Sequence, residues 1–166
     1  MKTLEKAYWE AFDCINIKKN EKVILKSKNL DYCYLFARDI FKSNIKLFEK
    51  IILESKNPYY CYCFAKDVFE ANIKKHEEVV LESKDIHYCY LFSKNIIRAN
   101  IKAHELVVLE RKNACYCFIF AKDVLDSNKE ELFKIILESG NKGYINLFLE
   151  DVEFDKEKYI NYLLFI

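Results

Sequence analysis

Seven cysteines and three histidines are the side chains of this 166-residue chain that could ligate a metal or act as nucleophiles. Two pairs of cysteines lie two residues apart, Cys61 with Cys63 and Cys115 with Cys117. On a helix such residues diverge by about 200°, which disfavours shared ligation of one ion. One cysteine series, Cys33, Cys61, Cys89 and Cys117, recurs every 28 residues, which predicts separations of about 8–10 Å or more. We therefore expect small core residues, with no metal and no cofactor.

The histidines and the remaining polar residues show no recognisable catalytic pattern. His76 and His104 occupy a position where the corresponding segments have Phe48 and Leu132, which predicts a core role, and His87 is expected to be exposed. The chain has no Gly-x-Ser-x-Gly, no glycine-rich phosphate loop and no His-Glu-x-x-His. We therefore expect that the chain is not an enzyme.

A second set of residues combines aromatic rings with cations and is the best candidate binding site. Each of Tyr34, Tyr62, Tyr90 and Phe118 lies four residues before a cation, and these cations are Arg38, Lys66, Lys94 and Lys122. On a helix this spacing lets the cation touch the ring. A basic aromatic ridge of this kind could take acidic protein segments or single-stranded RNA. In the alternative interpretation, the rings pack between repeats and the cations pair with Asp39, Asp67, Asp123 and Asp151.

These residues belong to a sequence repeat of 28 residues that accounts for the whole chain. The repeat is clearest in VILKSKNLDYCYLFARDIF at 23–41 and IILESKNPYYCYCFAKDVF at 51–69. The repeats are 1–28, 29–56, 57–84, 85–112, 113–140 and 141–166, so the last is two residues short. We expect one domain over residues 1–166, built from six repeats.

Most repeats contain two signals for the start of a helix. With Asn29 as repeat position 1, most repeats have Asn or Asp at position 1 and Asn at position 16, both of which are preferred N-cap residues. Pro58 directly follows Asn57, which suits the first turn of a helix. We therefore predict one helix, called helix A, over about positions 2–13, and a second, helix B, over about positions 17–27.

The apolar periodicity of the two helices predicts how they pack. In helix A, positions 5, 8, 9 and 12 share one stripe, for example Cys33, Phe36, Ala37 and Ile40. Position 7 lies on the opposite side and is also apolar, so we expect helix A to be sandwiched between neighbouring repeats. Helix B keeps one charged half. This pattern predicts an all-α fold, a right-handed α-solenoid of six two-helix repeats of 28 residues.

The helix-pair repeat is similar in kind to HEAT, armadillo and tetratricopeptide repeats, although it is shorter. More closely, the phrase Tyr-Cys-Tyr-x-Phe-Ala-Lys-Asp-Val at 60–68 resembles that of tandem-repeat proteins of unassigned function in AT-rich bacterial and phage genomes. The resemblance covers about residues 29–154. It implies a helical-repeat fold and a bacterial or phage setting, and it implies no activity.

Composition narrows the class of protein further. The chain is 52% hydrophobic with a formal net charge of +1, and it has two glycines and one proline, which argues against a disordered chain and against an all-β fold. No stretch has the roughly 20 apolar residues that a membrane span needs. The odd number of cysteines excludes a fully paired disulfide set within one chain. We expect a cytoplasmic protein that makes no membrane contact.

The end of the chain and two charged series suggest contacts between repeats or with a partner. The chain closes on an apolar segment that includes Leu163, Leu164 and Phe165, which we expect to pack under the last helix A, to form a homodimer, or to bind a partner. Lysines at position 18 and glutamates at position 26 oppose the dipole of helix B. Ion pairs between repeats are the expected compensation.

The most concrete functional hypothesis is a non-catalytic protein-binding solenoid. Given the resemblance, it would be a phage-derived inhibitor that occupies a surface of a bacterial defence complex such as a CRISPR nuclease. The alternatives are an RNA-binding solenoid that uses the basic aromatic ridge, with RNA or a ribonucleoprotein as partner, and a structural homo-oligomer. RNA ranks second because residues 1–84 carry +3 and residues 85–166 carry −2, a mild gradient for a nucleic-acid binder. Trp9 has no assigned role.

Overall fold

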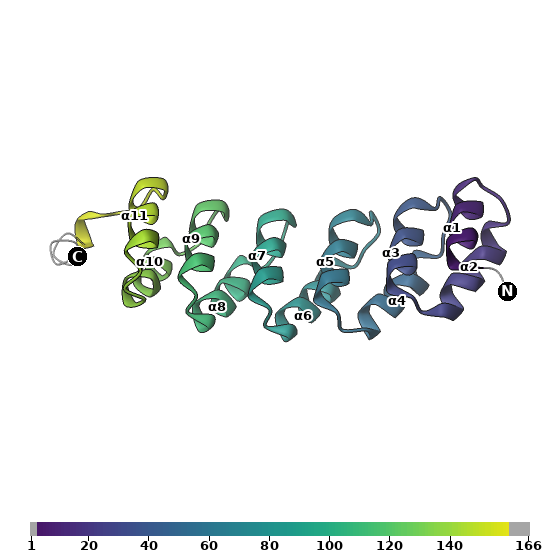
Figure 1. Cartoon of the computed structure of the whole chain (residues 1–166), viewed down its shortest axis with the longest axis horizontal. Coiled ribbons are helices and arrows are strands. Elements are labelled where there is room, and N and C mark those ends of the chain that lie inside the picture. The colour runs from purple at the N-terminus through teal and green to yellow at the C-terminus, as the bar shows by residue number, and fades with distance from the viewer. Residues whose placement is uncertain (1–2, 160–166) are drawn as a thin grey trace. The chain divides into compact units, whose positions relative to one another are not determined.

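The structure of the chain, a computed structural model, describes residues 3–159. Within this range it contains eleven α-helices, one short 3-10 helix and no strand (Figure 1). The chain divides into two compact units, residues 1–83 and residues 84–166. The prediction of an all-α fold of two-helix repeats is confirmed, whereas the prediction of one domain over residues 1–166 stays a prediction.

The N-terminal unit, residues 1–83, consists of three successive helix pairs. Its helices are α1 (Leu4–Phe12), α2 (Ile17–Ser27), α3 (Leu30–Asp39), α4 (Ile45–Glu54), α5 (Pro58–Asp67) and α6 (Ile73–Ser83). Each odd-numbered helix packs against the even-numbered helix that follows it, and α1, α3 and α5 also pack against one another in chain order. Stacked helix pairs of this kind form an α-solenoid, in which each repeat buries its apolar surface on its neighbour.

The C-terminal unit, residues 84–166, repeats this arrangement. Its helices are α7 (Ile86–Asn95), α8 (Ile101–Arg111), α9 (Ala114–Asp123), α10 (Lys129–Glu138) and α11 (Lys142–Asp151), followed by the 3-10 helix η1 (Glu157–Tyr159). Helix α9 packs against α7, α10 and α11. The sixth repeat thus contributes one α-helix and η1 to the described residues, and most of the predicted second helix of this repeat lies outside them.

The predicted N-caps of helix A are present in all five later repeats. The side chains of Asn29, Asn57, Asp85, Asn113 and Asn141 each accept a hydrogen bond from a backbone N–H in the first turn. The caps of helix B are less uniform. Asn100 and Asn128 cap α8 and α10 in the same way, whereas Asn16 and Asn44 make no side-chain cap bond. Asn16 and Asn44 are nevertheless the N-cap residues of α2 and α4, so position 16 marks the start of helix B as predicted, without a side-chain bond in these two repeats.

Helix A ends at position 11, two residues earlier than predicted. The residue at position 12 is a buried valine or isoleucine with extended backbone, for example Ile40 at φ −95°, ψ 109° and Val124 at φ −102°, ψ 114°. A β-branched side chain suits extended backbone better than a helix. The chain therefore leaves helix A at position 12, keeps that side chain in the core and directs position 13 away from it.

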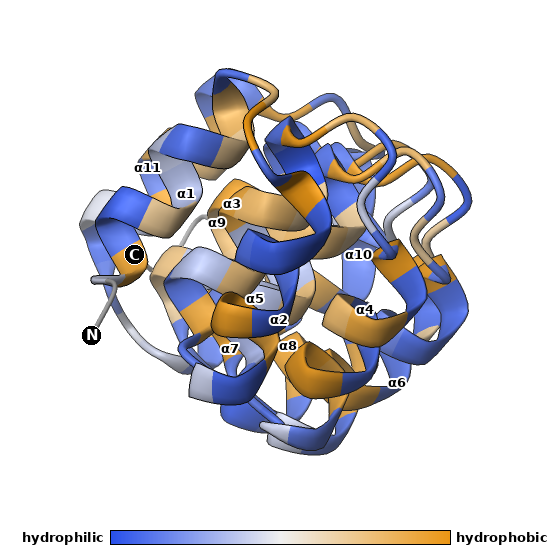
Figure 2. Cartoon of the chain, turned by 90° about the vertical axis from the view of Figure 1, so that its right-hand side faces the viewer, coloured by the Kyte–Doolittle hydropathy of each residue, from blue (hydrophilic) through white to orange (hydrophobic). Residues whose placement is uncertain are grey.

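The predicted core stripe of helix A is confirmed. The phenylalanines at position 8, which are Phe36, Phe64, Phe92, Phe120 and Phe148, are all fully buried. In the second to fourth repeats this ring packs against position 20 of helix B of the same repeat: the ring centroids lie 5.2 Å apart for Phe36 and Phe48 and 5.0 Å apart for Phe64 and His76. In Figure 2 the ribbons change between hydrophobic and hydrophilic colour along the helices, as expected for helices with one buried face.

The first repeat departs from the register of the others. Its helix A is capped by Thr3, at position 3 instead of position 1. As a result Ala7 and Tyr8, both buried, take the places that Cys33 and Tyr34 have in the second repeat. The strict 28-residue register placed Glu5 and Lys6 there, and this alignment was wrong because α1 and the turn after it are each one residue shorter than their counterparts in the second repeat.

Candidate functional site

The predicted contacts between rings and cations on helix A are present in all four repeats. The guanidinium carbon of Arg38 lies 5.1 Å from the centroid of the Tyr34 ring. The corresponding Nζ-to-centroid distances are 5.9 Å for Lys66 and Tyr62, 5.5 Å for Lys94 and Tyr90, and 5.5 Å for Lys122 and Phe118. These distances are within the range of cation–π attraction.

Three of the four cations also form ion pairs with aspartates at position 11 of helix A. Arg38 pairs with Asp39 of its own repeat at 2.6 Å, whereas Lys94 and Lys122 pair with Asp123 and Asp151 of the next repeat at 2.8 Å and 2.7 Å. The rings of Tyr62, Tyr90 and Phe118 are each 8% exposed. Little ring surface is therefore open to a ligand, and three of the four cations carry a carboxylate partner.

Tyrosine hydroxyls extend this contact from one repeat to the next. The Tyr34 hydroxyl donates to Asp67 Oδ2 at 2.5 Å, and the Tyr8 hydroxyl donates to Asp39 Oδ2 at 2.7 Å. The Tyr90 hydroxyl donates to Asp123 in the same way. Burial and the acceptor Asp67 raise the pKa of Tyr34 to about 12. These tyrosines therefore stay protonated donors.

Lys66 differs from the other three cations of this series. Among the described residues, no carboxylate pairs with Lys66, and the position-11 residue of the following repeat is Asn95 where the other later repeats have Asp. The geometry places the predicted binding residues on one face of successive helices within each unit, but it couples them mainly to one another. Their role in binding a partner stays a prediction.

A buried glutamate at position 21 is a feature that the sequence analysis missed. Glu21 is 4% exposed, and its Oε1 accepts from the Asn44 N–H at 3.0 Å. Glu49 accepts from the Asn72 N–H at 2.5 Å, and Glu105 accepts from the Asn128 N–H. Each glutamate thus caps helix B of the next repeat. The sequence does show that glutamate recurs at position 21, as Glu21, Glu49, Glu77 and Glu105. The sequence analysis did not use this recurrence, because position 21 lies on the half of helix B that was expected to face water.

Position 20 of helix B is a core position, as predicted. His76 and His104 are both fully buried. His76 Nε2 lies 3.2 Å from Glu49 Oε1, and the His104 ring lies 5.3 Å from the Phe92 ring. Burial lowers the pKa of His76, and the opposing effect of Glu49 does not overcome it. His76 is therefore a neutral core residue near neutral pH.

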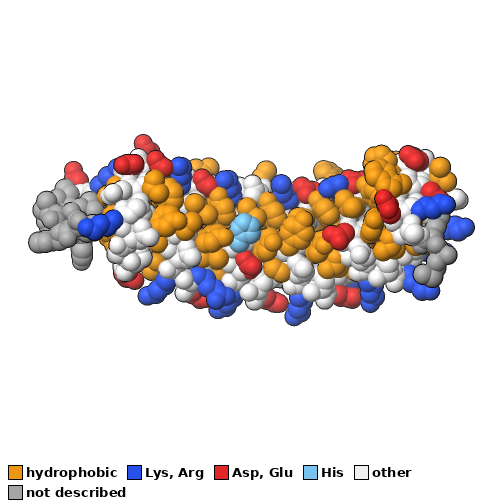
Figure 3. Space-filling model, viewed as in Figure 1, with side chains coloured by type: hydrophobic (Ala, Val, Ile, Leu, Met, Phe, Trp, Pro, Cys, Tyr) orange, Lys and Arg blue, Asp and Glu red, His pale blue; other side chains and the backbone are white. Residues whose placement is uncertain are grey.

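Four large apolar side chains at position 13 project into solvent, and the sequence analysis did not single them out. We call these residues, Phe41, Phe69, Ile97 and Leu125, the turn-tip residues. They are 79%, 102%, 85% and 86% exposed, respectively. The corresponding residue of the last repeat is Glu153. Figure 3 shows apolar side chains at the surface between basic and acidic ones. Position 13 lies in the turn after helix A, where helical periodicity cannot predict whether a side chain is buried or exposed.

A charged residue follows each turn-tip residue, and its sign alternates along the chain. These residues are Lys42, Glu70, Arg98 and Asp126. All four are exposed, and none of them forms an ion pair within residues 3–159. Lys42, Arg98 and Asp126 have positive φ angles of 65°, 74° and 63°, so the tight turn presents each charge beside its apolar neighbour.

In the N-terminal unit the two turns border a surface groove. Phe41 and Phe69 line it together with Lys42, Glu70 and Ile45, and its volume is about 450 Å³. The groove is larger than one apolar side chain. It is open to solvent between two turns whose apolar side chains are themselves exposed, which suits a protruding side chain of a partner.

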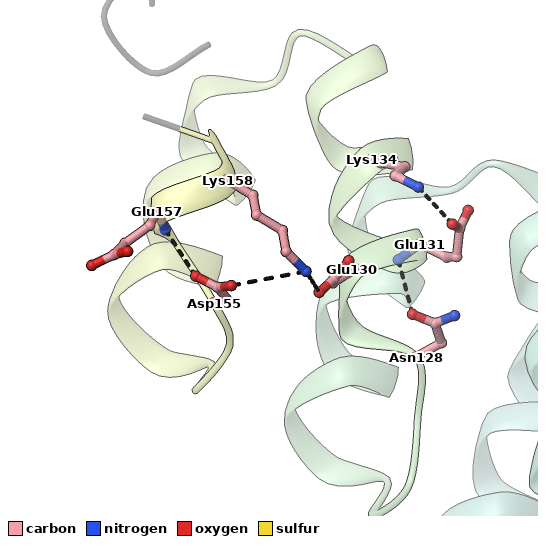
Figure 4. A network of polar contacts seen from close by, with 7 residues as sticks. All are labelled: Asn128, Glu130, Glu131, Lys134, Asp155, Glu157 and Lys158. Atoms are coloured by element: carbon pink, nitrogen blue, oxygen red, sulfur yellow. Dashed lines mark hydrogen bonds and ion pairs between the residues drawn. The ribbon is translucent and has the colours of Figure 1, made fainter. Parts of the chain in front are cut away.

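Ion pairs between repeats engage glutamates at position 26 of helix B, as expected, but their lysine partners stand at position 28, beyond the helix. Among the position-18 lysines within residues 3–159, only Lys158 pairs with another repeat. Lys56 pairs with Glu82 at 3.8 Å, and Lys84 pairs with Glu110 at 3.0 Å. At the end of the described chain, Lys158 reaches back to Glu130 at 2.8 Å (Figure 4). Side chains so exposed contribute little to stability, and Lys46, Lys74 and Lys102 form no ion pair within residues 3–159.

The described end of the chain is closed by aromatic side chains. Phe133 stands at position 21, where four earlier repeats have glutamate, and its ring stacks on Phe148 at a centroid distance of 4.7 Å. Phe154 and Tyr159 lie within 4.8 Å and 5.1 Å of the same ring. The predicted contact residues Leu163, Leu164 and Phe165 lie outside the described residues, so their role stays a prediction.

Four of the seven thiols are buried. All seven cysteines are free, and Cys33, Cys61, Cys89 and Cys117 are buried. Burial raises the pKa of Cys61 to about 12 and that of Cys33 to about 11. Within residues 3–159, no group of three or more His, Cys, Asp or Glu side chains is arranged to hold a metal ion, and no helix is long and apolar enough to cross a bilayer.

No protein-family model, curated protein or solved structure matches the chain.

Proposed function

We propose that the chain is a non-catalytic protein-binding module that contacts its partner through the turn-tip residues. The observation that carries this proposal is the full exposure of large apolar side chains at four equivalent turns, above all Phe69 at 102% and Phe41 at 79%. A folded protein gains nothing from an apolar side chain in water, so clusters of them mark surfaces that a partner covers. Phenylalanine is also enriched at the centres of protein interfaces.

The basic aromatic ridge supports a partner contact less well. Single-stranded RNA stacks its bases on exposed ring faces and needs unpaired cations along its backbone. The rings at position 6 of the third to fifth repeats are 8% exposed, and Arg38, Lys94 and Lys122 have aspartate partners. We therefore rank RNA binding below protein binding.

The finer proposal concerns the identity of the partner. An inhibitor that occupies a bacterial defence complex would need an exposed surface and no catalytic centre, and the turn-tip residues offer such a surface. The proposed bacterial or phage setting rests on the resemblance of the repeat phrase at 60–68. The chemistry of the turns itself supports only a protein partner with a complementary apolar surface.

The experiment is a tagged pull-down from cells of the source type, with the lysate divided into a nuclease-treated and an untreated half. Wild type is compared with Phe41→Ser/Phe69→Ser, and with Leu47→Ser/Leu106→Ser as the matched control, because Leu47 and Leu106 are exposed apolar residues on helices, at 45% and 61%. We expect a stoichiometric protein that wild type and control retain and that the turn variant loses.

Two results contradict the proposal. One is recovery of RNA alone, with nothing left after nuclease treatment, which would favour the basic aromatic ridge instead. The other is a protein that the Phe41→Ser/Phe69→Ser variant still retains at the wild-type level, since the turn-tip residues would then not form the contact. Circular dichroism of each variant checks that the fold is kept, as expected for side chains outside the core.

A further inference from the structure

We propose that the turn-tip residues bind a second copy of this chain, in antiparallel orientation. The inference rests on the proposed function, because it names the partner of the same surface. It uses two features together, the exposed apolar side chains and the alternating charges beside them. An interface between identical chains related by a two-fold axis must be complementary to itself, and this pattern has that property.

The order of charges is what makes the surface self-complementary. Along the chain the turns carry Phe41 with Lys42, Phe69 with Glu70, Ile97 with Arg98 and Leu125 with Asp126, so that basic and acidic turns alternate. A second copy in antiparallel orientation presents the reversed order. Each basic turn then faces an acidic turn, and each apolar side chain faces another apolar side chain.

This complementarity is present in each unit by itself. Within the N-terminal unit alone, reversal places Lys42 opposite Glu70 of the second copy and Phe41 opposite Phe69 of the second copy. The C-terminal unit repeats the arrangement with Arg98 and Asp126. If the turns of the N-terminal unit instead meet the turns of the C-terminal unit of the second copy, reversal places Lys42 opposite Asp126 and Glu70 opposite Arg98, which are again opposite charges. Opposite charges select this orientation because like charges across an interface cost affinity.

The groove between the turns gives the apolar side chains a place to dock. In the N-terminal unit, Phe41 and Phe69 border a groove of about 450 Å³ that Lys42 and Glu70 also line. A turn-tip side chain of a second copy that enters this groove brings its neighbouring charge to the rim. The charges thereby pair at the solvent-exposed edge, and the apolar side chains form the centre, as in typical protein interfaces.

The same charges argue against other occupants. Glu70 and Asp126 stand beside half of the turn-tip residues, and an anionic lipid surface or a nucleic-acid backbone would repel them. The two turn-tip side chains of each unit expose on the order of 300–400 Å². This is below the roughly 800 Å² per partner of a standard interface, so we expect a weak, reversible dimer with a micromolar dissociation constant.

The test is sedimentation velocity of the whole chain from about 1 to about 200 µM, which brackets such an affinity. The disrupting variant is Lys42→Glu/Arg98→Glu, which makes every turn acidic. Its matched control, Lys46→Glu/Lys102→Glu, changes the net charge equally on exposed lysines outside the turns. The restoring variant exchanges all four charges, Lys42→Glu/Glu70→Lys/Arg98→Glu/Asp126→Lys, and keeps the net charge.

We expect wild type to dimerise, the all-acidic variant to raise the dissociation constant at least tenfold, and the control and the four-residue exchange to stay within about threefold of wild type. A contact of the chain with itself in which basic turns meet acidic turns predicts restoration by the exchange, whereas a different partner of fixed charge does not. A wild-type chain that stays monomeric at 200 µM, an all-acidic variant that dimerises normally, or an exchange that fails to restore dimerisation would each overturn the inference.

These outcomes are separable from the proposed function. A monomeric wild type that captures a different protein through Phe41 and Phe69 overturns the second copy as occupant and leaves protein binding in place. A monomer that instead co-sediments with vesicles of anionic lipid also overturns it. A dimer that Phe41→Ser/Phe69→Ser leaves intact contradicts the role of the turn-tip residues in both proposals.

Discussion

Glu21 caps the helix that begins after Asn44, through a hydrogen bond of 3.0 Å from the Asn44 backbone N–H to Glu21 Oε1. The Asn44 side chain makes no cap bond of its own. The first turn of α4 is therefore completed by a carboxylate from the preceding repeat, and the helix dipole stabilises that carboxylate. One contact thus joins two repeats and begins a helix.

The Glu21→Ala substitution should destabilise the N-terminal unit. It removes the acceptor for the Asn44 N–H, and a lost helix cap costs about 1–2 kcal/mol. Equilibrium urea unfolding measures the loss, and Glu21→Gln, which keeps an acceptor oxygen, should recover part of it. Glu78→Ala on the exposed face of α6 is the control and should change stability by less than about 0.5 kcal/mol. Equal losses for Glu21→Ala and Glu78→Ala would contradict the capping role.

His76 should make the stability of the chain depend on pH. Burial holds its pKa below the ordinary value of 6.5, so between the folded and unfolded pKa values the unfolded chain binds more protons. The neutral form of His76 therefore contributes fully to the folding stability above pH 6.5, and this contribution to stability is lost as the pH falls through the pKa of His76 in the folded chain. His76→Phe should reduce the loss of stability between pH 7 and pH 5, because Phe48 fills this position in the second repeat.

Urea unfolding at several pH values measures this effect. His87, which is exposed, supplies the control, and His87→Gln should leave the pH profile of wild type unchanged. A His76→Phe profile with the same slope as wild type would mean that His76 is not a source of the pH dependence.

The Lys28→Gly substitution should stabilise the N-terminal unit. Lys28 follows α2 with φ 53°, in the left-handed region, where an L side chain is strained by about 1 kcal/mol. The equivalent residue of the fifth repeat is Gly140, at φ 64°. We expect a gain of about 0.5–1 kcal/mol in thermal or urea unfolding after the entropy of glycine is included. Lys26→Gly, inside the last turn of α2, should instead cost about 1 kcal/mol.

The Phe118→Tyr substitution should add a hydrogen bond between repeats of the kind that Tyr34 and Tyr90 already form. Tyr34 and Tyr90 each donate to the aspartate 33 residues later, and the corresponding residue for Phe118 is Asp151. A hydroxyl there would stabilise the C-terminal unit by up to about 1 kcal/mol. Urea unfolding of Phe118→Tyr and of Phe118→Tyr/Asp151→Ala tests this, since the gain should disappear in the double variant relative to Asp151→Ala.

Much of the fold could be predicted from the sequence because it repeats local patterns. The 28-residue period, the Asn or Asp at position 1 and the apolar stripe through Phe36 and Phe64 each act over a few residues. They predicted the helix pairs and the buried faces. These local patterns placed the end of helix A two residues too late. The valine or isoleucine at position 12 takes an extended backbone because its side chain packs into the core, and periodicity along one helix does not describe that packing.

The candidate site could be predicted only in part. The contacts between rings and cations followed from the spacing of four residues, and all four are present. Their pairing with aspartates was one of two open interpretations, because a spacing within one helix says nothing about the next repeat. Glu21 was missed for the same reason, since the Asn44 N–H that it caps belongs to a neighbouring helix pair.

After the first repeat, the sequence by itself determined which described segments are helical, where their helices begin and which apolar residues form the core, because backbone capping and apolar periodicity are local. Only the tertiary structure decided that Asp67 accepts from Tyr34 of the preceding repeat and that Phe69 stands in water. Both depend on how helix pairs stack and on the direction in which the chain leaves helix A. These relationships join residues that are far apart in sequence, and they arise only when the repeats pack.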